Sequence, residues 1–287
     1  MSTIPPKNSL IDTLLPSEMA VKAEEVGVAK ANMGFLKTFV LAFLAGSFIG
    51  LGAIFATTVT TGSSLHWGIS KLIGGLSFSL GLILVIVAGA ELFTGNNLIS
   101  MAWASGKIKT MALVRNWGIV YLGNLIGSLA LVCLMFLSQQ YTFGHGQVGI
   151  KALQIADAKC NLEFIQAVSL GILCNVLVCL AVWLCFSART TTDKILAIIF
   201  PITAFVAVGF EHSVANMYFI PKGLLIKSLA GEEFWSIVQQ SPGAYDHLTW
   251  QNFVFHNLIP VTIGNIIGGA LMVGMVYWFV YLRKEKN

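Results

Sequence analysis

Two pairs of polar residues stand at the same spacing in two long apolar regions of the chain. Asn96 follows Glu91 by five positions, and Asn216 follows Glu211 by five positions, with His212 beside the second glutamate. Ionisable side chains are costly inside a membrane, where they mark ion pathways and proton relays, and histidine titrates near neutral pH when it is unperturbed. Neighbouring residues on a helix point about 100° apart. We therefore expect His212 to serve a route for a small solute, while Glu211 and Glu91 tie down the backbone.

The composition indicates that lipid surrounds most of this chain. Hydrophobic residues make up 56% of the 287 residues and charged residues 10%, whereas a soluble domain carries about 25% charged residues. The net charge of +4 is too small to indicate a nucleic-acid partner. No CxxC pair and no Cys/His cluster has metal spacing, so we expect no metal, no cofactor and cysteines that act as small buried hydrophobic residues. The cysteines are Cys133, Cys160, Cys174, Cys179 and Cys185.

Six apolar regions predict six membrane spans. Four have the length of a single span, since about 20 residues cross the hydrocarbon. The second and fifth regions each have roughly 32 residues, about 48 Å as one helix, and carry the polar residues named above. Irregular backbone at that depth survives only inside protein or beside a water-filled cavity, so we expect both helices to break in mid-membrane. The regions are Leu36–Val59, Leu72–Trp103, Trp117–Leu137, Phe164–Phe186, Ile195–Ile226 and Leu258–Leu282.

A second match supports an internal repeat. The sequence of Asn124–Ser128 in the third region resembles that of Asn265–Gly269 in the sixth. Together with the matching breaks, this indicates two halves of three spans each that enter the membrane in opposite orientations, as in many transporters and channels. Three GxxxG pairs predict close helix packing, either within one protomer, which we favour, or between protomers. These pairs are Gly46 with Gly50, Gly123 with Gly127, and Gly264 with Gly268.

The charged residues divide the chain and orient it. Residues 1–35 form a tail in which Pro16–Lys30 predicts a short amphipathic helix capped by Ser17, residues 36–283 form the six-span domain, and residues 284–287 form a second tail. No apolar run precedes Leu36, so the first span is expected to act as its own insertion signal. Six spans put both tails on one side, which holds twelve of the 17 Lys and Arg residues. This excess predicts cytoplasmic termini.

Three stretches around the breaks resemble the signatures of the formate/nitrite transporter family. They are Ile86–Gly95, Gly171–Ala181 and Phe210–Met217, while Leu14–Glu25 and Asn257–Asn265 look most like the formate-channel branch. The resemblance implies an all-α, aquaporin-like homopentamer in a bacterial inner membrane, with one formate pore in each protomer. It also implies that a cytosolic formate-producing enzyme binds the N-terminal tail.

One sequence feature leaves the identity of the transported anion undecided. Gly95-Asn96 after Thr94 is a pairing more typical of the nitrite branch, so nitrite and hydrosulfide remain alternatives to formate.

The resemblance also implies which residues form the pore. A central site of Thr94 and His212 would lie between apolar constrictions, and formate would pass in both directions, linked to protons. Lys159, Glu211 and Asn265 would support this site, as would Glu91. The implied pore residues are Phe78, Leu82, Leu92, Phe93, Thr94, Asn175, Val178, Phe205 and His212.

Individual residues admit more than one role. Thr94 is a good candidate to cap the helix that resumes after the first break, and a helix N-terminus attracts an anion. His212 would either donate a proton to formate or stabilise the anion until a proton arrives. Between the two halves, His145 and Lys151 are expected to lie in a solvated outer loop, with Lys159 as the exception.

Three other functions are considered and set aside. A neutral-solute channel of the aquaporin type would carry an Asn-Pro-Ala repeat, which this sequence lacks. A haem-bearing membrane redox enzyme would need paired histidines at matching depth, and His256 lies only at the edge of the sixth region. A hydrolase would need a nucleophile that faces a base, and Ser213, as the immediate neighbour of His212, points elsewhere. We therefore expect a channel or transporter and not an enzyme.

Overall fold

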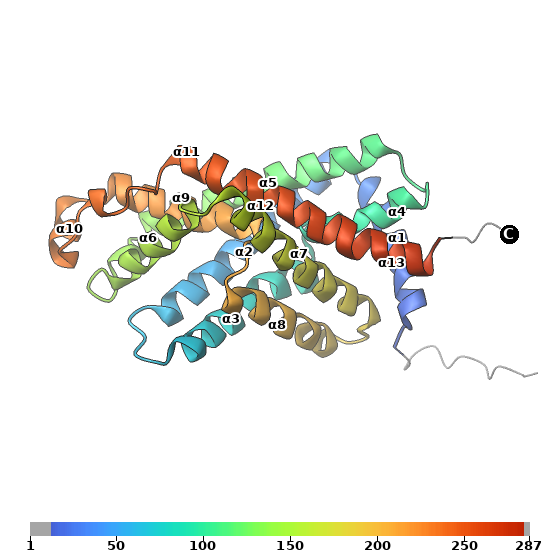
Figure 1. The fold of residues 1–287 in the computed structure, drawn as a ribbon, viewed down its shortest axis with the longest axis horizontal. Coiled ribbons are helices and arrows are strands. Elements are labelled where there is room, and N and C mark those ends of the chain that lie inside the picture. Colours follow the sequence, from blue (N-terminus) through green and yellow to red (C-terminus); the bar gives the residue numbers. More distant parts are fainter. Residues whose placement is uncertain (1–12, 284–287) are drawn as a thin grey trace, which may run out of the picture.

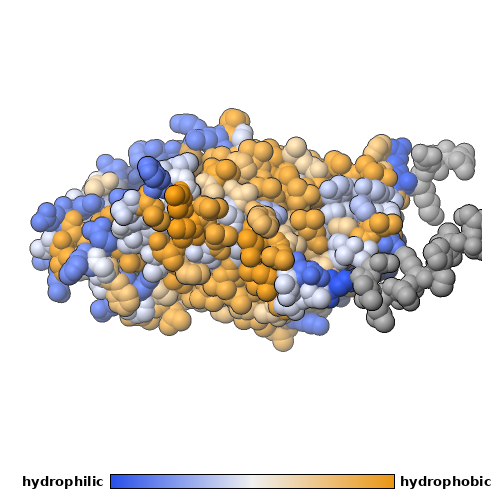
Figure 2. Space-filling model, turned by 90° about the horizontal axis from the view of Figure 1, so that it is seen from below, coloured by the Kyte–Doolittle hydropathy of each residue, from blue (hydrophilic) through white to orange (hydrophobic). Residues whose placement is uncertain are grey.

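The computed structural model describes residues 13–283, and all regular secondary structure in this part of the chain is helical (Figure 1). Six helical runs within it are long and apolar enough to cross a membrane, which confirms the six spans predicted from the sequence. On the face seen in Figure 2, hydrophobic residues form a broad central band, and hydrophilic residues gather mainly toward the two ends. The six runs are Phe35–Thr60, Trp67–Gly89, Thr110–Leu137, Phe164–Ser187, Thr191–Val208 and Trp250–Tyr281.

The first half of the chain consists of a surface helix, three spans and a short helical turn. Its helices are α1 (Pro16–Ala31), α2 (Phe35–Thr60), α3 (Trp67–Ile83) continued by η1 (Leu84–Gly89), η2 (Gly95–Ile99) continued by α4 (Ser100–Ala104), α5 (Thr110–Leu137) and η3 (Gln140–Thr142).

The second half repeats this order. Its helices are α6 (Gln147–Cys160), α7 (Phe164–Ser187), α8 (Thr191–Val208), α9 (Ser213–Leu229), α10 (Glu232–Val238), η4 (Pro242–Ala244), and then one continuous run of α11 (Trp250–Asn252), η5 (Phe253–Leu258), α12 (Ile259–Ile266), η6 (Ile267–Met275) and α13 (Val276–Tyr281). The last span therefore starts at Trp250, earlier than the apolar run at Leu258 indicated, because its first two turns mix polar and aromatic residues.

Both predicted helix breaks are present. In the second apolar region the helix stops at Gly89 and resumes at Gly95, and in the fifth it stops at Val208 and resumes at Ser213. The breaks leave short stretches of non-helical backbone, Ala90–Thr94 and 209–212, which are buried at Glu91–Thr94 and at Glu211 and His212, while Gly209 is exposed. The fold is thus the predicted pair of inverted repeats, and each repeat contains one discontinuous span.

The segment between the two halves is not the loop that the sequence analysis predicted. His145 does lie in a turn, but Lys151 and Lys159 belong to the helix α6. This helix packs against α9, where Gly223 leaves room for the Ala156 side chain on α6. The error arose because α6 is too short and too polar to register as an apolar region.

The helix α1 spans the segment for which the sequence predicts an amphipathic helix, but it starts differently. Its N-cap position is Leu15, whose N–H donates to the Glu18 carboxylate over 2.9 Å, so the prediction of a Ser17 cap was wrong. Met19 and Ala20 on this helix pack in one apolar cluster with Trp183 of α7. The N-terminal region from residue 16 onward is therefore docked onto the membrane domain.

The glycine pairs serve packing within the protomer. A methyl group at Gly127 on α5 would overlap the backbone of Phe43 on α2, and one at Gly268 on η6 would overlap the backbone of Ile172 on α7. The α2–α5 contact and its counterpart in the second half are therefore built in the same way, with glycine where two backbones approach closely.

Most cysteines behave as expected. Cys160, Cys174, Cys179 and Cys185 are buried, whereas Cys133 is exposed on α5, so the expectation of burial was wrong there. Its neighbour Val132 faces the protein interior, which turns Cys133 outward. Burial raises the pKa of the Cys160 thiol to about 12, so this thiol stays neutral beside Lys159 at pH 7.

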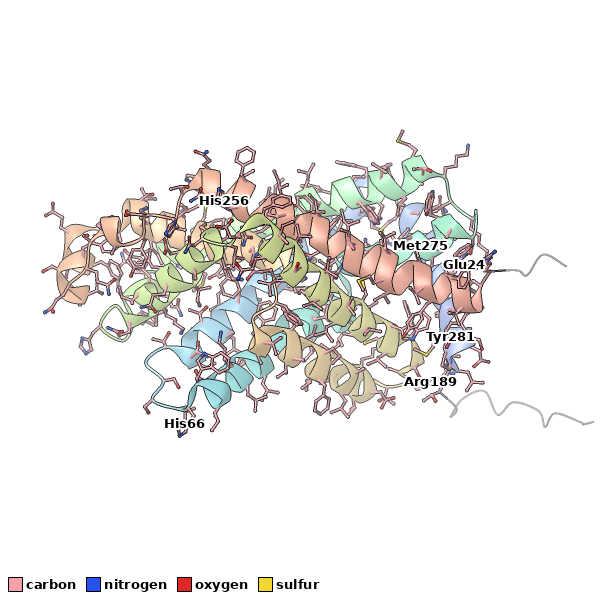
Figure 3. The ribbon with its side chains drawn as sticks, viewed as in Figure 1. Glu24, His66, Arg189, His256, Met275 and Tyr281 are labelled. Carbon is pink, nitrogen blue, oxygen red and sulfur yellow. The ribbon has the colours of Figure 1, made fainter. Side chains whose placement is uncertain are left out.

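The two ends of the described chain lie at the same end of the molecule. Figure 1 places α1 and α13 close together there, opposite α10 and α6. In Figure 3, Glu24, Arg189 and Tyr281 lie toward this end, while His66 lies in the opposite half. This arrangement agrees with an even number of spans.

Candidate functional site

Each helix break begins at a glycine in the left-handed backbone region. Gly89 has φ +84° and Gly209 has φ +81°. Glycine adopts such angles readily because it has no Cβ, so it ends a helix without strain. The two breaks therefore start from the same local backbone form, one in each repeat.

An asparagine on α5 holds the first break in place. Asn124 donates from Nδ2 to the carbonyls of Ala42, over 2.8 Å, and Glu91, over 2.9 Å. Its Oδ1 accepts the Phe93 N–H over 2.9 Å. The Glu91 N–H reaches the Leu41 carbonyl on α2 over 3.2 Å. These bonds pair backbone groups that the break would otherwise leave unsatisfied in a buried, apolar setting.

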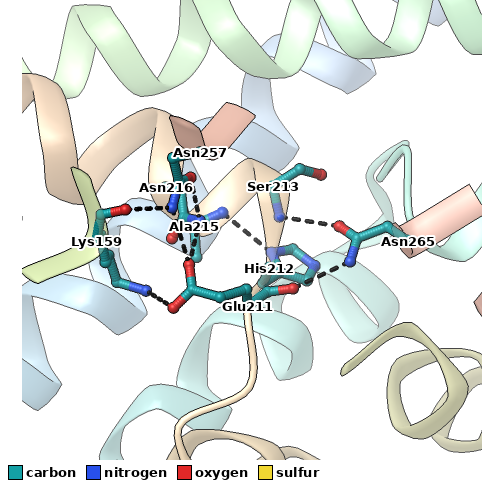
Figure 4. Close-up of polar contacts among 8 residues, drawn as sticks. All are labelled: Lys159, Glu211, His212, Ser213, Ala215, Asn216, Asn257 and Asn265. Carbon is teal, nitrogen blue, oxygen red and sulfur yellow. Dashed lines mark hydrogen bonds and ion pairs between the residues drawn. The ribbon is translucent and has the colours of Figure 1, made fainter. Parts of the chain in front are cut away.

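An asparagine on α12 holds the second break in the same way (Figure 4). Asn265 donates from Nδ2 to the carbonyls of Gly171, over 2.8 Å, and Glu211, over 3.0 Å, and accepts the Ser213 N–H over 2.9 Å. The Glu211 N–H reaches the Leu170 carbonyl on α7 over 3.3 Å. Asn265 was implied as a supporting residue, and its contacts are those of a backbone clamp.

An ion pair between a buried glutamate and a partly buried lysine lies beside each break. In the first half, Lys30 of α1 lies 2.9 Å from the Glu91 carboxylate. Asn96 donates from Nδ2 to Glu91 over 2.7 Å and to Asn116 Oδ1 over 3.0 Å. The Lys30 ammonium also donates to Asn96 Oδ1 over 2.8 Å. Each polar group of this cluster thereby has a partner, as a buried charge requires.

The second half carries the matching cluster (Figure 4). Lys159 of α6 lies 2.7 Å from the Glu211 carboxylate, and Asn216 donates from Nδ2 to Glu211 over 2.7 Å and to Asn257 Oδ1 over 2.6 Å. The two clusters differ in detail. Asn257 also donates from Nδ2 to the Glu211 carboxylate over 3.2 Å, and Asn216 Oδ1 has no hydrogen-bond partner among residues 13–283. The cluster of the second half therefore keeps one acceptor without a partner in the described part of the chain.

Thr94 and His212 meet between the two breaks. Thr94 Oγ1 lies 2.9 Å from His212 Nε2, and both side chains are buried. His212 Nδ1 accepts the Ala215 N–H over 3.0 Å and so caps α9. A ring nitrogen that accepts carries no hydrogen. The neutral ring therefore holds its hydrogen on Nε2 and donates it to Thr94, which leaves the threonine hydroxyl hydrogen free to donate.

The capping role predicted for Thr94 was wrong. Thr94 does occupy the N-cap position of η2, but its side chain makes no capping hydrogen bond, and η2 is a 3-10 helix of five residues. The side-chain cap belongs instead to His212, at the start of the 17-residue helix α9. The positive end of a long helix dipole is thus directed at His212.

Two cavities approach this pair from opposite ends of the molecule. The cavity next to α1, which we call the inner cavity after the predicted orientation of the chain, has a volume of about 430 Å³, and its lining includes Lys30, Glu91, Leu82 and Leu92. The cavity next to α6, called the outer cavity on the same prediction, has a volume of about 700 Å³. Its lining includes Lys71, Lys151, Lys159, Phe78, Phe205 and His212.

Aromatic side chains close the outer cavity at its inner end. The rings of Phe78 and Phe205 meet edge to face with centroids 5.7 Å apart, and Phe205 stacks on the His212 ring at 5.9 Å. Leu82 follows Phe78 by one helical turn and lines the inner cavity. An apolar layer that contains one polar pair therefore separates the two cavities.

The other implied pore residues lie next to this layer without lining a cavity. Phe93 packs edge to face on Tyr121 with centroids 4.9 Å apart. Asn175 donates to the Asn265 carbonyl over 2.6 Å and to the Thr94 carbonyl over 3.3 Å, so it connects the two halves. Val178 is buried in the main apolar core.

Lys30, Asn116 and Asn257 belong to these clusters but were not predicted from the sequence. Asn116 precedes Asn124 by eight positions, and Asn257 precedes Asn265 by eight positions, so extending the third-to-sixth-region match would have found this pair. No comparable signal marked Lys30, because α1 and α6 share little sequence beyond a lysine near their C-terminal ends.

Comparisons with known proteins agree with this architecture. A family profile described as formate/nitrite transporter matches residues 17–279. The formate channel FocA of Escherichia coli K12 is 53% identical over 277 residues, which cover 96% of this chain and 97% of the relative. The FocA of Haemophilus influenzae is 43% identical over 263 residues, 91% of this chain and 93% of the relative. A solved pentameric formate channel with formate bound superposes with a TM-score of 0.83 at 50% identity, over 87% of this chain and 98% of that one.

Proposed function

This chain belongs to the formate/nitrite transporter family, and we propose that it conducts formate across the bacterial inner membrane as a homopentamer with one pathway in each protomer. The similarity to formate channels over nearly the whole chain supports this substrate and this assembly. The structural observation that carries the proposal is the Thr94–His212 hydrogen bond in the apolar layer between the two cavities. Both termini lie in the cytoplasm, as the excess of Lys and Arg on that side supports.

Charge brings the anion into the outer cavity. Lys71, Lys151 and Lys159 line this cavity together with Glu211, so positive charges outnumber negative ones there, and an excess of one sign raises the local concentration of the opposite ion. Lys159 is paired with Glu211, so its ammonium also holds the second break in place. The N-terminus of α9 adds a partial positive charge at the inner end of the cavity.

Formate crosses the apolar layer as formic acid. Moving a bare carboxylate into a dry site costs tens of kcal/mol in the idealised limit. A simple carboxylic acid titrates near pH 4, so protonating it at pH 7 costs only about 4 kcal/mol, at 1.36 kcal/mol for each unit. Protonation is therefore the cheaper route past Phe78 and Phe205, and transport is linked to protons in both directions.

His212 stabilises the anion and is not the proton source. An imidazolium would place a hydrogen on Nδ1, directly against the Ala215 N–H that Nδ1 now accepts. The ring therefore stays neutral while it caps α9, and its Nε2 hydrogen is donated to the Thr94 oxygen. This bond leaves the Thr94 hydroxyl hydrogen free to hold the carboxylate at the start of the layer until a proton from cavity water reaches it, so His212 acts on the anion through Thr94.

Flux measurements test the proposal. Purified protein in liposomes is challenged with formate, nitrite, acetate and hydrosulfide, and flux is recorded with an internal pH dye. Formate flux that exceeds the others and carries protons supports the proposal. Nitrite or hydrosulfide as the fastest solute assigns this chain to another branch of the family, and formate flux without proton movement rejects the neutral-acid route.

A further inference from the structure

Phe219 on α9 lines the outer cavity and extends the group of aromatic rings that closes it. Its ring stacks on the ring of Phe78 with centroids 6.3 Å apart and planes inclined by 18°. Phe78 in turn meets Phe205 edge to face, and Phe205 stacks on His212. Aromatic rings attract one another in these two arrangements at such distances. The apolar layer is therefore part of one continuous series of rings that runs from His212 to Phe219.

The backbones that carry the layer touch their neighbours directly. A methyl group at Gly52 on α2 would lie 2.6 Å from the Phe78 carbonyl oxygen on α3. Likewise, a methyl group at Gly75 on α3 would lie 2.6 Å from the Thr203 carbonyl oxygen on α8, two residues before Phe205. Such close-packed helices do not shift past one another without losing many contacts. The width of the layer therefore depends on the orientation of its rings, chiefly that of Phe78.

Two further features limit the movement of the Phe219 ring. The Lys159 ammonium lies 5.6 Å from the ring centroid, within the range of a cation–π attraction, and its ion pair with Glu211 keeps this lysine in place. Phe219 also lines a small cavity of about 10 Å³, which holds no more than about one water molecule. The ring has no space into which to withdraw, so it gives Phe78 a firm support.

We propose that Phe219 is a positioning residue that sets the size limit of the pathway by holding the Phe78 ring across the apolar layer. This inference rests on the formate conduction proposed above and adds the residue that decides which larger carboxylic acids are excluded. Acetic acid carries a methyl group where formic acid carries a hydrogen. A small rotation of the Phe78 ring therefore decides whether the larger acid passes.

Shortening the Phe219 side chain removes the support. Phe219→Leu keeps an apolar residue on α9 but no ring face, and the volume that it frees lies next to Phe78. The Phe78 ring then turns toward this volume, while the backbone contacts of α3 remain. We expect the ratio of acetate flux to formate flux to rise about 10-fold over wild type, the discrimination that one methylene-sized group gives in an apolar site.

Liposome flux of formate, acetate and gluconate tests the inference in wild type, Phe219→Leu and Phe253→Leu. Phe253 is the matched control, because its ring also packs on an aromatic neighbour, Trp250, with centroids 6.1 Å apart, and it lines neither the inner nor the outer cavity. It is 4% exposed, so a general packing defect should appear in this variant as well. The acetate-to-formate ratio should rise in Phe219→Leu and equal the wild-type ratio in Phe253→Leu, with no gluconate flux in any of the three proteins.

The ratio does not depend on how much protein is folded, so a merely structural role of Phe219 would leave it unchanged. An unchanged ratio in Phe219→Leu, an equal rise in Phe253→Leu, or gluconate flux through Phe219→Leu overturns the inference. Absence of formate flux in wild type rejects the proposed function, and this inference with it. If the leucine variant fails to fold, Phe219→Met replaces it with the same expectations, because methionine is flexible and fills irregular space without a ring face.

Discussion

Lys30 and Lys159 occupy equivalent positions in the two halves of the chain. Lys30 lies 2.9 Å from Glu91 and Lys159 lies 2.7 Å from Glu211. The first lysine belongs to α1 and the second to α6, and neither helix is one of the six candidate spans. The repeat therefore contains a surface helix in addition to its three spans, and that helix reaches into the break through its lysine.

We expect substitution of Lys30 to lower the stability of the protein, and a second substitution, at Glu91, to restore it. Lys30→Met leaves the Glu91 carboxylate buried without its cation, since the glutamate side chain is 7% exposed. We expect a loss of about 1–3 kcal/mol, less than for a fully buried pair because the Lys30 side chain is 26% exposed. Thermal unfolding in detergent measures this loss.

The double variant Lys30→Met/Glu91→Gln should recover most of that stability, because the amide carries no charge to compensate. Lys22→Met serves as the control, since Lys22 is exposed and lies 4.0 Å from an exposed Glu25. An equal loss in Lys30→Met and in the double variant would show that packing, and not charge, accounts for the effect.

Two substitutions of His212 should separate its role as helix cap and hydrogen-bond donor from its ability to gain and lose a proton. Asparagine is a good N-cap and keeps an N–H donor, so His212→Asn should retain formate flux and its dependence on external pH. His212→Leu introduces the residue type found at the corresponding position, Leu92. This substitution removes both the helix cap and the N–H donor. We expect it to lower flux by roughly 10- to 100-fold, the equivalent of a hydrogen bond to a charged group worth about 1.5–3 kcal/mol.

Liposome flux between pH 5 and pH 8 provides the measurement for these variants. Flux should rise as pH falls in both wild type and His212→Asn, because the concentration of formic acid rises, and no titration of His212 should appear. Loss of the pH dependence in His212→Asn alone would instead make His212 the proton donor.

We expect the substitution Gly268→Ala to disturb helix packing and to destabilise the protein. Alanine there would overlap the Ile172 carbonyl on α7, and because two backbones must move apart we expect at least about 1–3 kcal/mol of destabilisation. Gly118→Ala on α5 is the matched control, since its added methyl group meets nothing within 4 Å. This control should stabilise by about 0.4–1 kcal/mol. Equal yields and unfolding temperatures for both variants would contradict the close approach of η6 and α7.

We expect two truncations of the N-terminal region to have different effects on formate flux. Removing residues 2–12 should leave liposome flux unchanged, whereas removing residues 2–29 also deletes most of α1, which lines the inner cavity through Ala23 and Gly27. The longer truncation should therefore alter flux in liposomes as well as in cells. If the shorter truncation lowers formate export only in cells, a cytosolic partner at the tail is supported, and unchanged export in both settings argues against one.

Strong local patterns made the membrane fold predictable from the sequence. Apolar regions give the six spans directly, and the repeated spacing of Glu91 to Asn96 and Glu211 to Asn216 marks both breaks. The match of Asn124 with Asn265 marks the two clamps. These residues recur because a break inside the membrane leaves backbone groups that only a small set of amide and carboxylate side chains can pair.

The surface helices and the chemistry at the centre were harder to predict. The α6 helix escaped notice because its apolar face covers α9 while its other face is polar, so its mean hydropathy resembles that of a loop. The sequence suggested Thr94 as the helix cap, whereas in the structure His212 caps a helix and Thr94 does not. His212 has this role because it precedes the longer helix, α9. The tertiary position of α9 determines this, and a single sequence does not reveal it.

The first repeat ends and the second, inverted repeat begins at the short turn between Thr142 and Gln147. The helix α6, which starts there, is the first helix of the second half. Cutting the backbone in this turn would yield two fragments of matching design. Each would carry its entire lysine–glutamate–asparagine cluster and its own clamp. The Thr94–His212 bond and the contacts of Asn175 with Thr94 would join one fragment to the other. Each half thus holds its own break, but the halves also pack on one another, with α3 against α8 so closely that a methyl group at Gly75 would overlap the backbone of Thr203, and the polar pair at the centre exists only where they meet.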